Sequence, residues 1–341
     1  MSLLNLSPVY VDPMVNVNYA SFYILGLYQK FGKDNIIFTN KPFKQLALKS
    51  RVNCLNFVIN DKKYTIDFGE LNSVKPDVYA WCDVYGHVNA NVARTPEKFR
   101  GKLVSLAPYF GVKLYSHIDS ALYAWKNIWK TMHKTLPFTL VQRYRKQCRY
   151  RVYYEEYEKK SAITENAVFH LSSVWLNEDW HRNDEAFNEA NAHFITACKS
   201  IPELVFDGGL SFAENVKCSP SLKKLKCKGS VSVKDYLEKT AQSLLAFSAP
   251  YSNGSHGWKL GEYLALGKAI ISTPLVNDLP APLVHGENIH FVENDEKSMR
   301  EAVLLIMRNK TYREKLEKGA RAYWEKYGTP AKALELLGIT S

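Results

Sequence analysis

The sequence predicts an α/β protein built from two units. Three observations predict it: the chain has 341 residues, short apolar runs alternate with helical stretches in both halves, and a long basic helical region separates the halves. A chain of this length usually forms two cores. Its composition, 46% hydrophobic and 23% charged, excludes a disordered chain and a small disulfide scaffold. We expect the first unit over residues 1–160 and the second over residues 161–325.

The first half reads as short strands and helices. Apolar runs predict a helix at 19–31 and strands at 8–12, 35–39, 55–59, 64–68, 77–81 and 102–106. The turn at 60–63 predicts that the strands beside it form an antiparallel hairpin. From residue 117 to about 160 the pattern becomes helical, aromatic and basic, with an interruption at Pro137.

The second half returns to the alternation of strands and helices. We expect strands at 167–171, 204–207, 244–248 and 268–272, and helices at 184–198, 233–242, 296–309 and 311–327. In open α/β sheets, ligands bind beyond the carboxyl ends of the strands. The residues that follow each strand are therefore the first candidates for a functional site.

The positive charge of the chain is local. There are 45 Lys and Arg against 34 Asp and Glu, a formal net charge of +11. Eight cations and no acid lie in Lys126–Arg151, interleaved with aromatic residues, and six lie in Lys217–Lys234. The first run is typical of a solvated helix face, of a surface that meets an anionic membrane or acceptor, or of a nucleic-acid contact. No helix-turn-helix or RNA-recognition motif accompanies it, so we expect no nucleic acid as partner.

The cysteines and the N-terminus bear on the cellular compartment of the protein. The six cysteines show no Cys-x-x-Cys pair and no zinc-ligand spacing. No Asp-x-Asp element follows a predicted strand, so we expect no metal. The N-terminus shows no leader pattern, and no apolar run reaches the roughly 20 residues that span a bilayer. These features predict a reduced, cytoplasmic setting, with any membrane contact made at the cytoplasmic surface.

Most of the functional signal lies in residues 249–274. A strand leads into a loop rich in Gly, Ser and Asn, and a helix then begins near Gly257 and ends at Gly267. Such a loop leaves backbone N–H groups free to bind a phosphate or diphosphate. Lys259 adds a full charge in the first turn. Glu262, three residues on, lies on the same helix face, where its carboxylate can accept hydrogen bonds from ribose hydroxyls.

The same spacing also fits a solvated ion pair between Lys259 and Glu262. A resemblance favours the nucleotide interpretation. Residues 257–272, Gly-Trp-Lys-Leu-Gly-Glu-Tyr-Leu-Ala-Leu-Gly-Lys-Ala-Ile-Ile-Ser, resemble the C-terminal donor-binding motif of GT-B glycosyltransferases, a Lys-x-x-Glu helix followed by an apolar strand. Supporting resemblances follow at 284–292, 294–303 and 327–331, so that the likeness covers about half the chain.

The resemblance implies the GT-B architecture: two Rossmann-like α/β domains facing a central cleft, the N-terminal one binding the acceptor, with residues 326–341 crossing back to it. It implies a UDP- or GDP-linked sugar as donor and no cofactor. Glu262 would hold the ribose. The residues implied at the diphosphate are Ser255, His256, Gly257 and Lys259.

One position departs from the family pattern. Many GT-B enzymes with retaining chemistry carry Glu-x7-Glu, and Gly254 stands here at the first of these acids, whereas Glu262 is the second. In that pattern the second acid contacts the nucleotide ribose and the first approaches the donor sugar. The resemblance therefore implies nucleotide binding and leaves open whether the reaction is retaining or inverting.

Residues after other predicted strands are further candidates. Asp83 and His87 follow the strand predicted at 77–81, where similar transferases place a residue that serves the acceptor; a buried loop anchor is the alternative for each. Ser172 ends the first strand of the second half, and Arg182 lies in the loop that follows. Both are candidates for binding the donor diphosphate.

These observations lead to one hypothesis and two alternatives. The hypothesis is a metal-independent glycosyltransferase of hexosyltransferase type that acts on a glycan or lipid-linked acceptor, in surface polysaccharide or lipopolysaccharide biosynthesis. A sugar-nucleotide epimerase or hydrolase of the same fold would instead consume the donor without an acceptor. A basic nucleic-acid-binding protein would lose affinity steeply as salt rises.

Overall fold

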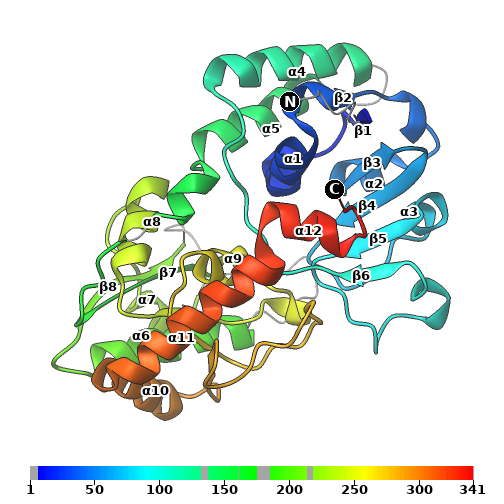
Figure 1. Ribbon diagram of the computed structural model, residues 1–341. Coiled ribbons are helices and arrows are strands. Elements are labelled where there is room, and N and C mark those ends of the chain that lie inside the picture. Colours follow the sequence, from blue (N-terminus) through cyan, green and yellow to red (C-terminus); the bar gives the residue numbers. More distant parts are fainter. Residues whose placement is uncertain (1–6, 132–136, 160, 175–184, 213–217, 341) are drawn as a thin grey trace, which may run out of the picture. The chain divides into compact units, whose positions relative to one another are not determined.

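The computed structural model describes residues 7–131, 137–159, 161–174, 185–212 and 218–340. The chain forms two compact units (Figure 1). The first comprises Met1–Glu156, Asn277–Ala281 and Lys326–Ser341, and the second comprises Tyr157–Val276 and Pro282–Glu325. Both units consist of strands and helices, so the expectation of an α/β protein with two units is confirmed.

The first unit is built on a six-stranded sheet in the order β2-β1-β3-β4-β5-β6. Its strands are β1 (Val9–Val11), β2 (Ile36–Phe38), β3 (Cys54–Ile59), β4 (Lys62–Asp67), β5 (Val84–His87) and β6 (Leu103–Ser105). β3 is antiparallel to β1 and β4, and the other neighbours are parallel. The predicted hairpin is confirmed as β3–β4. Asn60 and Asp61 at its turn have φ values of 48° and 62°, the left-handed conformation that these residues tolerate.

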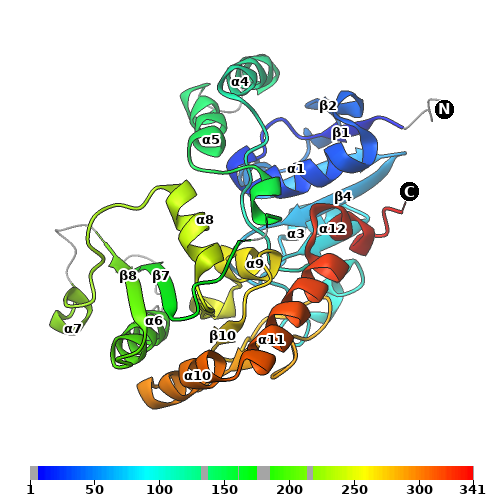
Figure 2. The same cartoon turned by 60° about the vertical axis from the view of Figure 1, so that its left-hand side comes forward.

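The helices of the first unit are α1 (Val17–Phe31), α2 (Leu48–Asn53), α3 (Pro76–Trp81), α4 (His117–Thr131), α5 (Pro137–Arg149) and α12 (Pro330–Leu336). α1 packs against both α5 and α12, and Figure 2 shows α12 close to α1. Gly26 permits this approach, because a Cβ there would lie 2.4 Å from the carbonyl oxygen of Pro330.

The strand predicted at 77–81 is wrong: these residues form helix α3, and the strand, β5, comes directly after it. Pro76 occupies the first turn of α3, where its missing N–H removes no helical hydrogen bond. Val78 and Trp81, three residues apart, are buried in one apolar cluster. That spacing is helical. Because burying this pair together stabilises the helix, the apolar alternation that had predicted a strand did not determine the structure.

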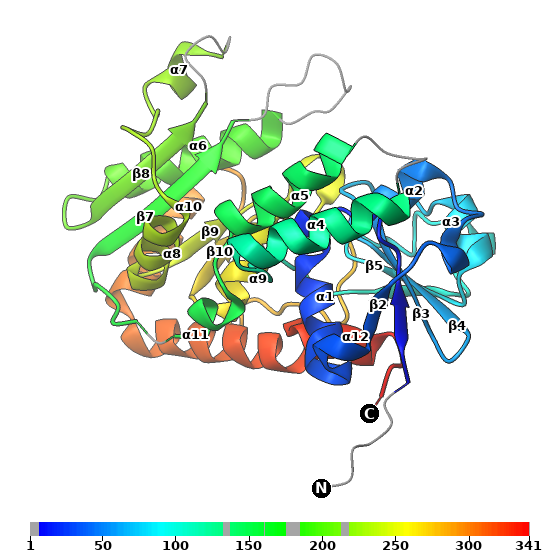
Figure 3. The ribbon, with the colours of Figure 1, turned by 90° about the horizontal axis from the view of Figure 1, so that it is seen from above.

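Among the described residues of the second unit, all strand pairs are parallel. β7 (Ala167–Ser173) pairs with β8 (Val205–Ser211), as Figure 3 shows, and β10 (Ile270–Ser272) lies between β9 (Ala246–Ser248) and β11 (His290–Phe291). The N–H of Leu244, just before β9, donates to the carbonyl oxygen of Ala167 at 2.7 Å. β7 and β9 are thus neighbours, and their carboxyl ends point the same way.

The helices of the second unit are α6 (Glu185–Lys199), α7 (Pro220–Lys223), α8 (Val233–Gln242), α9 (Trp258–Ala265), α10 (Glu296–Arg308) and α11 (Lys310–Tyr323). α6 packs against α10, and α11 packs against α9 and β10. Phe194 of α6 and Phe247 of β9 stack at the centre of the core, with ring centroids 4.4 Å apart. The loop between β9 and α9 is therefore fixed at its start by β9, which pairs with β10, and at its end by α9, which packs against α11.

Candidate functional site

The loop after β9 feeds directly into the N-terminus of α9, as the sequence predicts. Gly257 is the N-cap residue, and no side chain caps the helix. A Cβ at Gly257 would lie 2.3 Å from Cε2 of Tyr251, so glycine is needed where the loop folds over that ring. The first N–H groups of a helix have no partner inside the helix and carry the positive end of its dipole. The arrangement is therefore suited to an anion.

Lys259 extends from the first turn of α9 to β7. Its Nζ donates a hydrogen bond to the carbonyl oxygen of Leu171 at 2.5 Å. Burial lowers the pKa of this ammonium to about 8, an effect that the charge of Glu262 opposes. At neutral pH the side chain is still mainly protonated, so a positive charge lies at the carboxyl end of β7.

Two buried hydroxyl groups in this region are unsatisfied. Ser172 follows Leu171 in β7, and Ser255 lies two residues before the N-cap of α9; each is 1% exposed. Among the residues that the structure describes, neither Oγ atom has a hydrogen-bond partner. Buried polar atoms in native proteins are nearly always paired with protein, water or a ligand. Both hydroxyls are donors that an anionic ligand would satisfy.

Two buried histidines belong to the same region. Nε2 of His170 lies 2.8 Å from Oδ1 of Asn191, and burial, followed by the charge of Lys259, lowers the pKa of this imidazole well below its usual value. His170 is therefore a neutral core residue. His256, in the loop between Ser255 and the N-cap, is 8% exposed, so its ring forms part of the loop's packing.

Glu262 is held by two tyrosines that the sequence did not single out. Its Oε1 accepts a hydrogen bond from the hydroxyl of Tyr157 at 3.1 Å, and its Oε2 accepts one from Tyr236 of α8 at 3.0 Å. A carboxylate oxygen has two lone pairs, so each can accept a second hydrogen bond from a ligand hydroxyl. The two tyrosines fix the orientation of the carboxylate.

The structure thus places the described donor-site candidates in one unit, on β7, the loop after β9, and α9: Ser172, Ser255, His256, Gly257, Lys259 and Glu262. Arg182 lies outside the described residues. Gly254 has a φ of 71°, and a Cβ there would lie 2.5 Å from Cβ of Val276. The backbone at this position therefore has no room for the first glutamate of the family pattern.

Asp83 and His87 are not brought together. Asp83 precedes β5, is exposed, and accepts a hydrogen bond from the N–H of Lys63 at 2.8 Å through Oδ2. His87 ends β5 and is fully buried; its Nδ1 accepts a hydrogen bond from the N–H of Asn89 at 2.9 Å. Burial lowers the pKa of His87, against the opposing charge of Asp67. The length of a strand separates the two candidates, and both side chains anchor local backbone.

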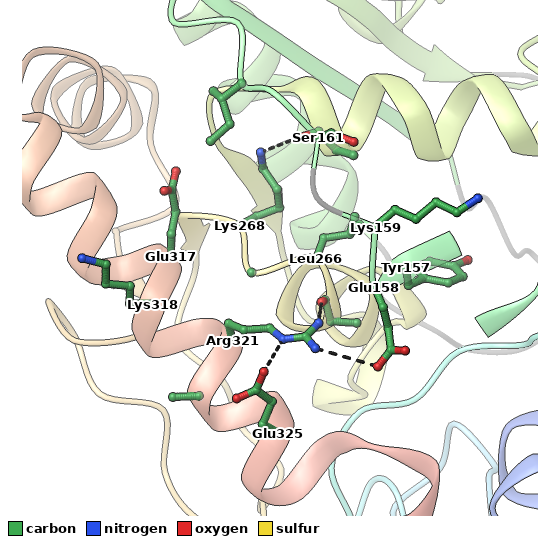
Figure 4. A pocket seen from close by; sticks show the side chains of 15 residues that line it. Tyr157, Glu158, Lys159, Ser161, Leu266, Lys268, Glu317, Lys318, Arg321 and Glu325 are labelled. Carbon is green, nitrogen blue, oxygen red and sulfur yellow. Dashed lines mark hydrogen bonds and ion pairs between the residues drawn. The ribbon is translucent and has the colours of Figure 1, made fainter. Parts of the chain in front are cut away.

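A separate pocket in the second unit has a volume of about 620 Å³ (Figure 4). Two of the cations that line it bind backbone carbonyls: Lys268 donates to Ala241 at 3.0 Å and Arg321 donates to Ala265 at 2.6 Å. These carbonyls belong to the C-terminal ends of α8 and α9, where the helix dipole is negative. Glu317 also lines the pocket. This site is therefore unsuited to a diphosphate, and the anion site lies at the other end of α9.

Two further features of the described residues concern membranes and metals. Over the ranges that the structure describes, no helix is both long and apolar enough to cross a bilayer. Within the same ranges, no three His, Cys, Asp or Glu side chains are grouped so that they could hold a metal ion.

Comparison with known proteins gives structural neighbours only. No family model matches the chain, and no curated protein sequence matches it. The C-terminal domain of a glycosyl transferase group 1 family protein from Francisella tularensis is 13% identical, with a TM-score of 0.36, over 51% of this chain and 92% of that one. A UDP-GlcNAc 2-epimerase from Neisseria meningitidis, bound to UDP-GlcNAc, is 14% identical, with a TM-score of 0.39, over 77% of this chain and 72% of that one.

A third solved structure is the complex of S. aureus MnaA with UDP. It is 10% identical, with a TM-score of 0.39, over 76% of this chain and 60% of that one. The chain thus spans less than two thirds of that protein's length.

Proposed function

We propose that the chain is a GT-B-type glycosyltransferase that transfers a hexosyl group from a UDP- or GDP-linked sugar. The observation that carries the proposal is the anion site of the second unit. It combines the uncapped N-terminus of α9, the ammonium of Lys259, and the unsatisfied hydroxyls of Ser172 and Ser255. A diphosphate supplies acceptor oxygens for all of these donors.

The same residues support the chemistry of transfer. Breaking the bond between the sugar and the diphosphate leaves negative charge on the leaving group, and fixed positive groups at that place lower the barrier. Lys259 and the N–H groups of α9 supply this charge, so the proposal needs no metal. Glu262, held by Tyr157 and Tyr236, would orient the nucleotide through its ribose. Neither Asp83 nor His87 carries the proposal.

We further propose that the acceptor is a glycan or a lipid-linked glycan and that the protein works in the cytoplasm, in assembly of a surface polysaccharide or lipopolysaccharide. The basic run Lys126–Arg151 supports contact with an anionic membrane surface; residues 132–136 lie outside the described residues, and most of the rest lies on α4 and α5 of the first unit. The structure corrects one detail of that run: Tyr144 is buried and accepts a hydrogen bond from Asn127, so it is no part of such a surface.

The serine hydroxyls allow a sharp test of the donor site. Ser172→Ala and Ser255→Ala remove groups that have no protein partner, so the free energy of unfolding of the free protein should stay within about 0.5 kcal/mol. If the hydroxyls bind the diphosphate, each substitution should weaken UDP or GDP binding about tenfold. The measurement is calorimetric titration, with thermal melting of the free protein alongside.

Ser243 provides the matched control. It is a buried serine of the same unit whose Oγ accepts from the N–H of Phe169 at 3.0 Å and donates to the carbonyl oxygen of Leu245 at 2.7 Å. Ser243→Ala should therefore lower stability by about 1–3 kcal/mol and leave nucleotide affinity unchanged. Equal nucleotide affinity in wild type, Ser172→Ala and Ser255→Ala would refute the proposed donor site. Donor consumption without any acceptor would identify an epimerase or hydrolase instead.

A further inference from the structure

α4 exposes the side that a surface helix normally buries. Its exposed side chains include Ile118 at 75%, Leu122 at 50%, Trp125 at 59% and Trp129 at 60%. The spacings of four, three and four residues place all of them on one helix face. Figure 1 shows α4 at the outer edge of the first unit. The result is an exposed apolar stripe that contains two tryptophans.

The opposite side of α4, which packs against α5, is mainly polar: of its four buried residues only Ala124 is apolar. Asn127 donates a hydrogen bond to the hydroxyl of Tyr144 at 2.7 Å, and Ser120 accepts one from Gln147 at 2.8 Å. Thr131 is also buried. A surface helix of a globular protein buries its apolar stripe and exposes its polar one. α4 does the reverse, and an exposed apolar patch of this kind marks an interaction surface.

The charges around the stripe indicate what it meets. Lys126 is exposed on α4, and Arg145, Lys146 and Arg149 are exposed on α5. The sequence has no acidic residue from position 120 to position 154. A second copy of the chain that presented the same face across a two-fold axis would bring like charges together. An anionic bilayer instead attracts the cations, and tryptophan prefers the boundary between headgroups and acyl chains.

We propose that the outward face of α4, defined by Ile118, Leu122, Trp125 and Trp129, inserts into the interfacial layer of an anionic phospholipid bilayer, while the cations of α4 and α5 bind the headgroups. This goes beyond electrostatic contact through the basic run, because apolar side chains enter the lipid. It requires no nucleotide, so it stands or falls separately from the proposed glycosyl transfer.

The test is flotation of the full chain with vesicles of phosphatidylcholine alone and of phosphatidylcholine mixed with phosphatidylglycerol. Wild type should float with the mixed vesicles only. Leu122→Ala should weaken this binding several-fold, because a leucine side chain loses its burial in lipid, and Trp125→Ala with Trp129→Ala should remove it. Leu48→Ala is the matched control: Leu48, on α2 of the same unit, is 46% exposed but does not belong to the α4 face, and its loss should change nothing.

A second measurement separates insertion from surface attraction. Brominated lipids in the mixed vesicles should quench tryptophan fluorescence, and Trp125→Phe with Trp129→Phe should remove most of the quenching while vesicle binding persists. All variants should melt as wild type does, because the substituted side chains are exposed. Unchanged flotation of the double alanine variant would overturn insertion. So would absence of vesicle binding together with a dimer that Trp125→Ala dissociates, because the face would then be covered by a second copy.

Discussion

Lys259 belongs to the proposed donor site and has a lowered pKa. Burial lowers the pKa of its ammonium to about 8, whereas a diphosphate beside it would favour the charged form. Nucleotide binding above pH 8 must therefore take up a proton. We predict that affinity for UDP is constant between about pH 7 and pH 8, where the terminal phosphate is fully ionised, and falls about tenfold for each pH unit above about 8, measured by calorimetric titration.

Lys259→Arg is the control for this prediction, because a guanidinium stays charged throughout the range. Its affinity should be lower than that of wild type at neutral pH, since a fork replaces a point charge, but the pH profile should be flat. A profile in the arginine variant that matches wild type would show that the titrating group is elsewhere, for example on the base of the nucleotide.

Glu262 can be tested through the ligand as well as through the protein. If its carboxylate binds the ribose, wild type should bind UDP about tenfold more tightly than the 2′-deoxy or the 3′-deoxy analogue. In Glu262→Ala this discrimination should vanish, so that all three ligands bind equally weakly. Persisting discrimination would place the ribose on another group. Tyr157→Phe and Tyr236→Phe should reduce the discrimination in part, because each removes one of the hydrogen bonds that orient the carboxylate.

Whether a site residue can be recognised from the sequence depends on how far along the chain it lies from the other site residues. Ser255, Gly257, Lys259 and Glu262 could be singled out as candidates because one strand–loop–helix unit presents them within eight positions. The tyrosines that hold Glu262 were not, because they lie 105 and 26 residues away along the chain. No local pattern marks a tyrosine that will donate to a distant carboxylate.

At the scale of elements, the loop before α9 explains the departure at Gly254. Its φ of 71° and its approach to Val276 mean that restoring the family's glutamate should destabilise the protein. We predict that Gly254→Glu lowers the free energy of unfolding by about 2–5 kcal/mol, from left-handed strain and overpacking together. Chemical denaturation measures this loss.

Gly229 isolates the strain from the overpacking. Its φ is 77°, and a Cβ there would have nothing within 4 Å. Gly229→Ala should therefore cost only about 1–2 kcal/mol, and Gly254→Ala should cost clearly more. Equal losses at the two positions would show that Val276 yields and that the fold does not exclude a side chain at 254.

Element prediction succeeded where the apolar period was unambiguous and failed where it was short. The helices later found as α1, α8, α10 and α11 each cover ten or more residues, enough for the period of 3.6 to show. Residues 77–81 are too few for either period to decide. Their helical state is determined by the proline at 76 and by burial of Val78 and Trp81 in one cluster, which is tertiary information.

At the scale of the molecule, the division of the chain was only partly visible in the sequence. Asn277–Ala281 belongs to the first unit although it lies far into the second half. Its contacts include the N–H of Asp278, which donates to the carbonyl oxygen of Ala90 at 2.7 Å, and Oδ2 of Asp278, which accepts from the N–H of Val92 at 2.6 Å. Oδ1 of Asn277 also accepts a hydrogen bond from Asn91 at 3.5 Å. These partners lie 186 or more residues away along the chain, so no local pattern in the sequence marks them.

A nucleotide should also distinguish the unfolding of the two units. The proposed nucleotide contacts all lie in the second unit, and no sheet of the described residues contains strands of both units. We predict two calorimetric transitions, and UDP should raise the midpoint temperature of only one of them. At a UDP concentration one hundred times the dissociation constant, the stabilisation of that unit should be about 2.7 kcal/mol. Arg51→Leu assigns the other transition to the first unit. Arg51 is fully buried and binds both carboxylate oxygens of Asp12 at 2.7 Å. Its loss leaves the charge of Asp12 buried and unpaired, which should lower the free energy of unfolding of the first unit by about 3–5 kcal/mol. If UDP raised the transition that Arg51→Leu lowers, the nucleotide site would lie in the first unit and the assignment to α9 would be wrong.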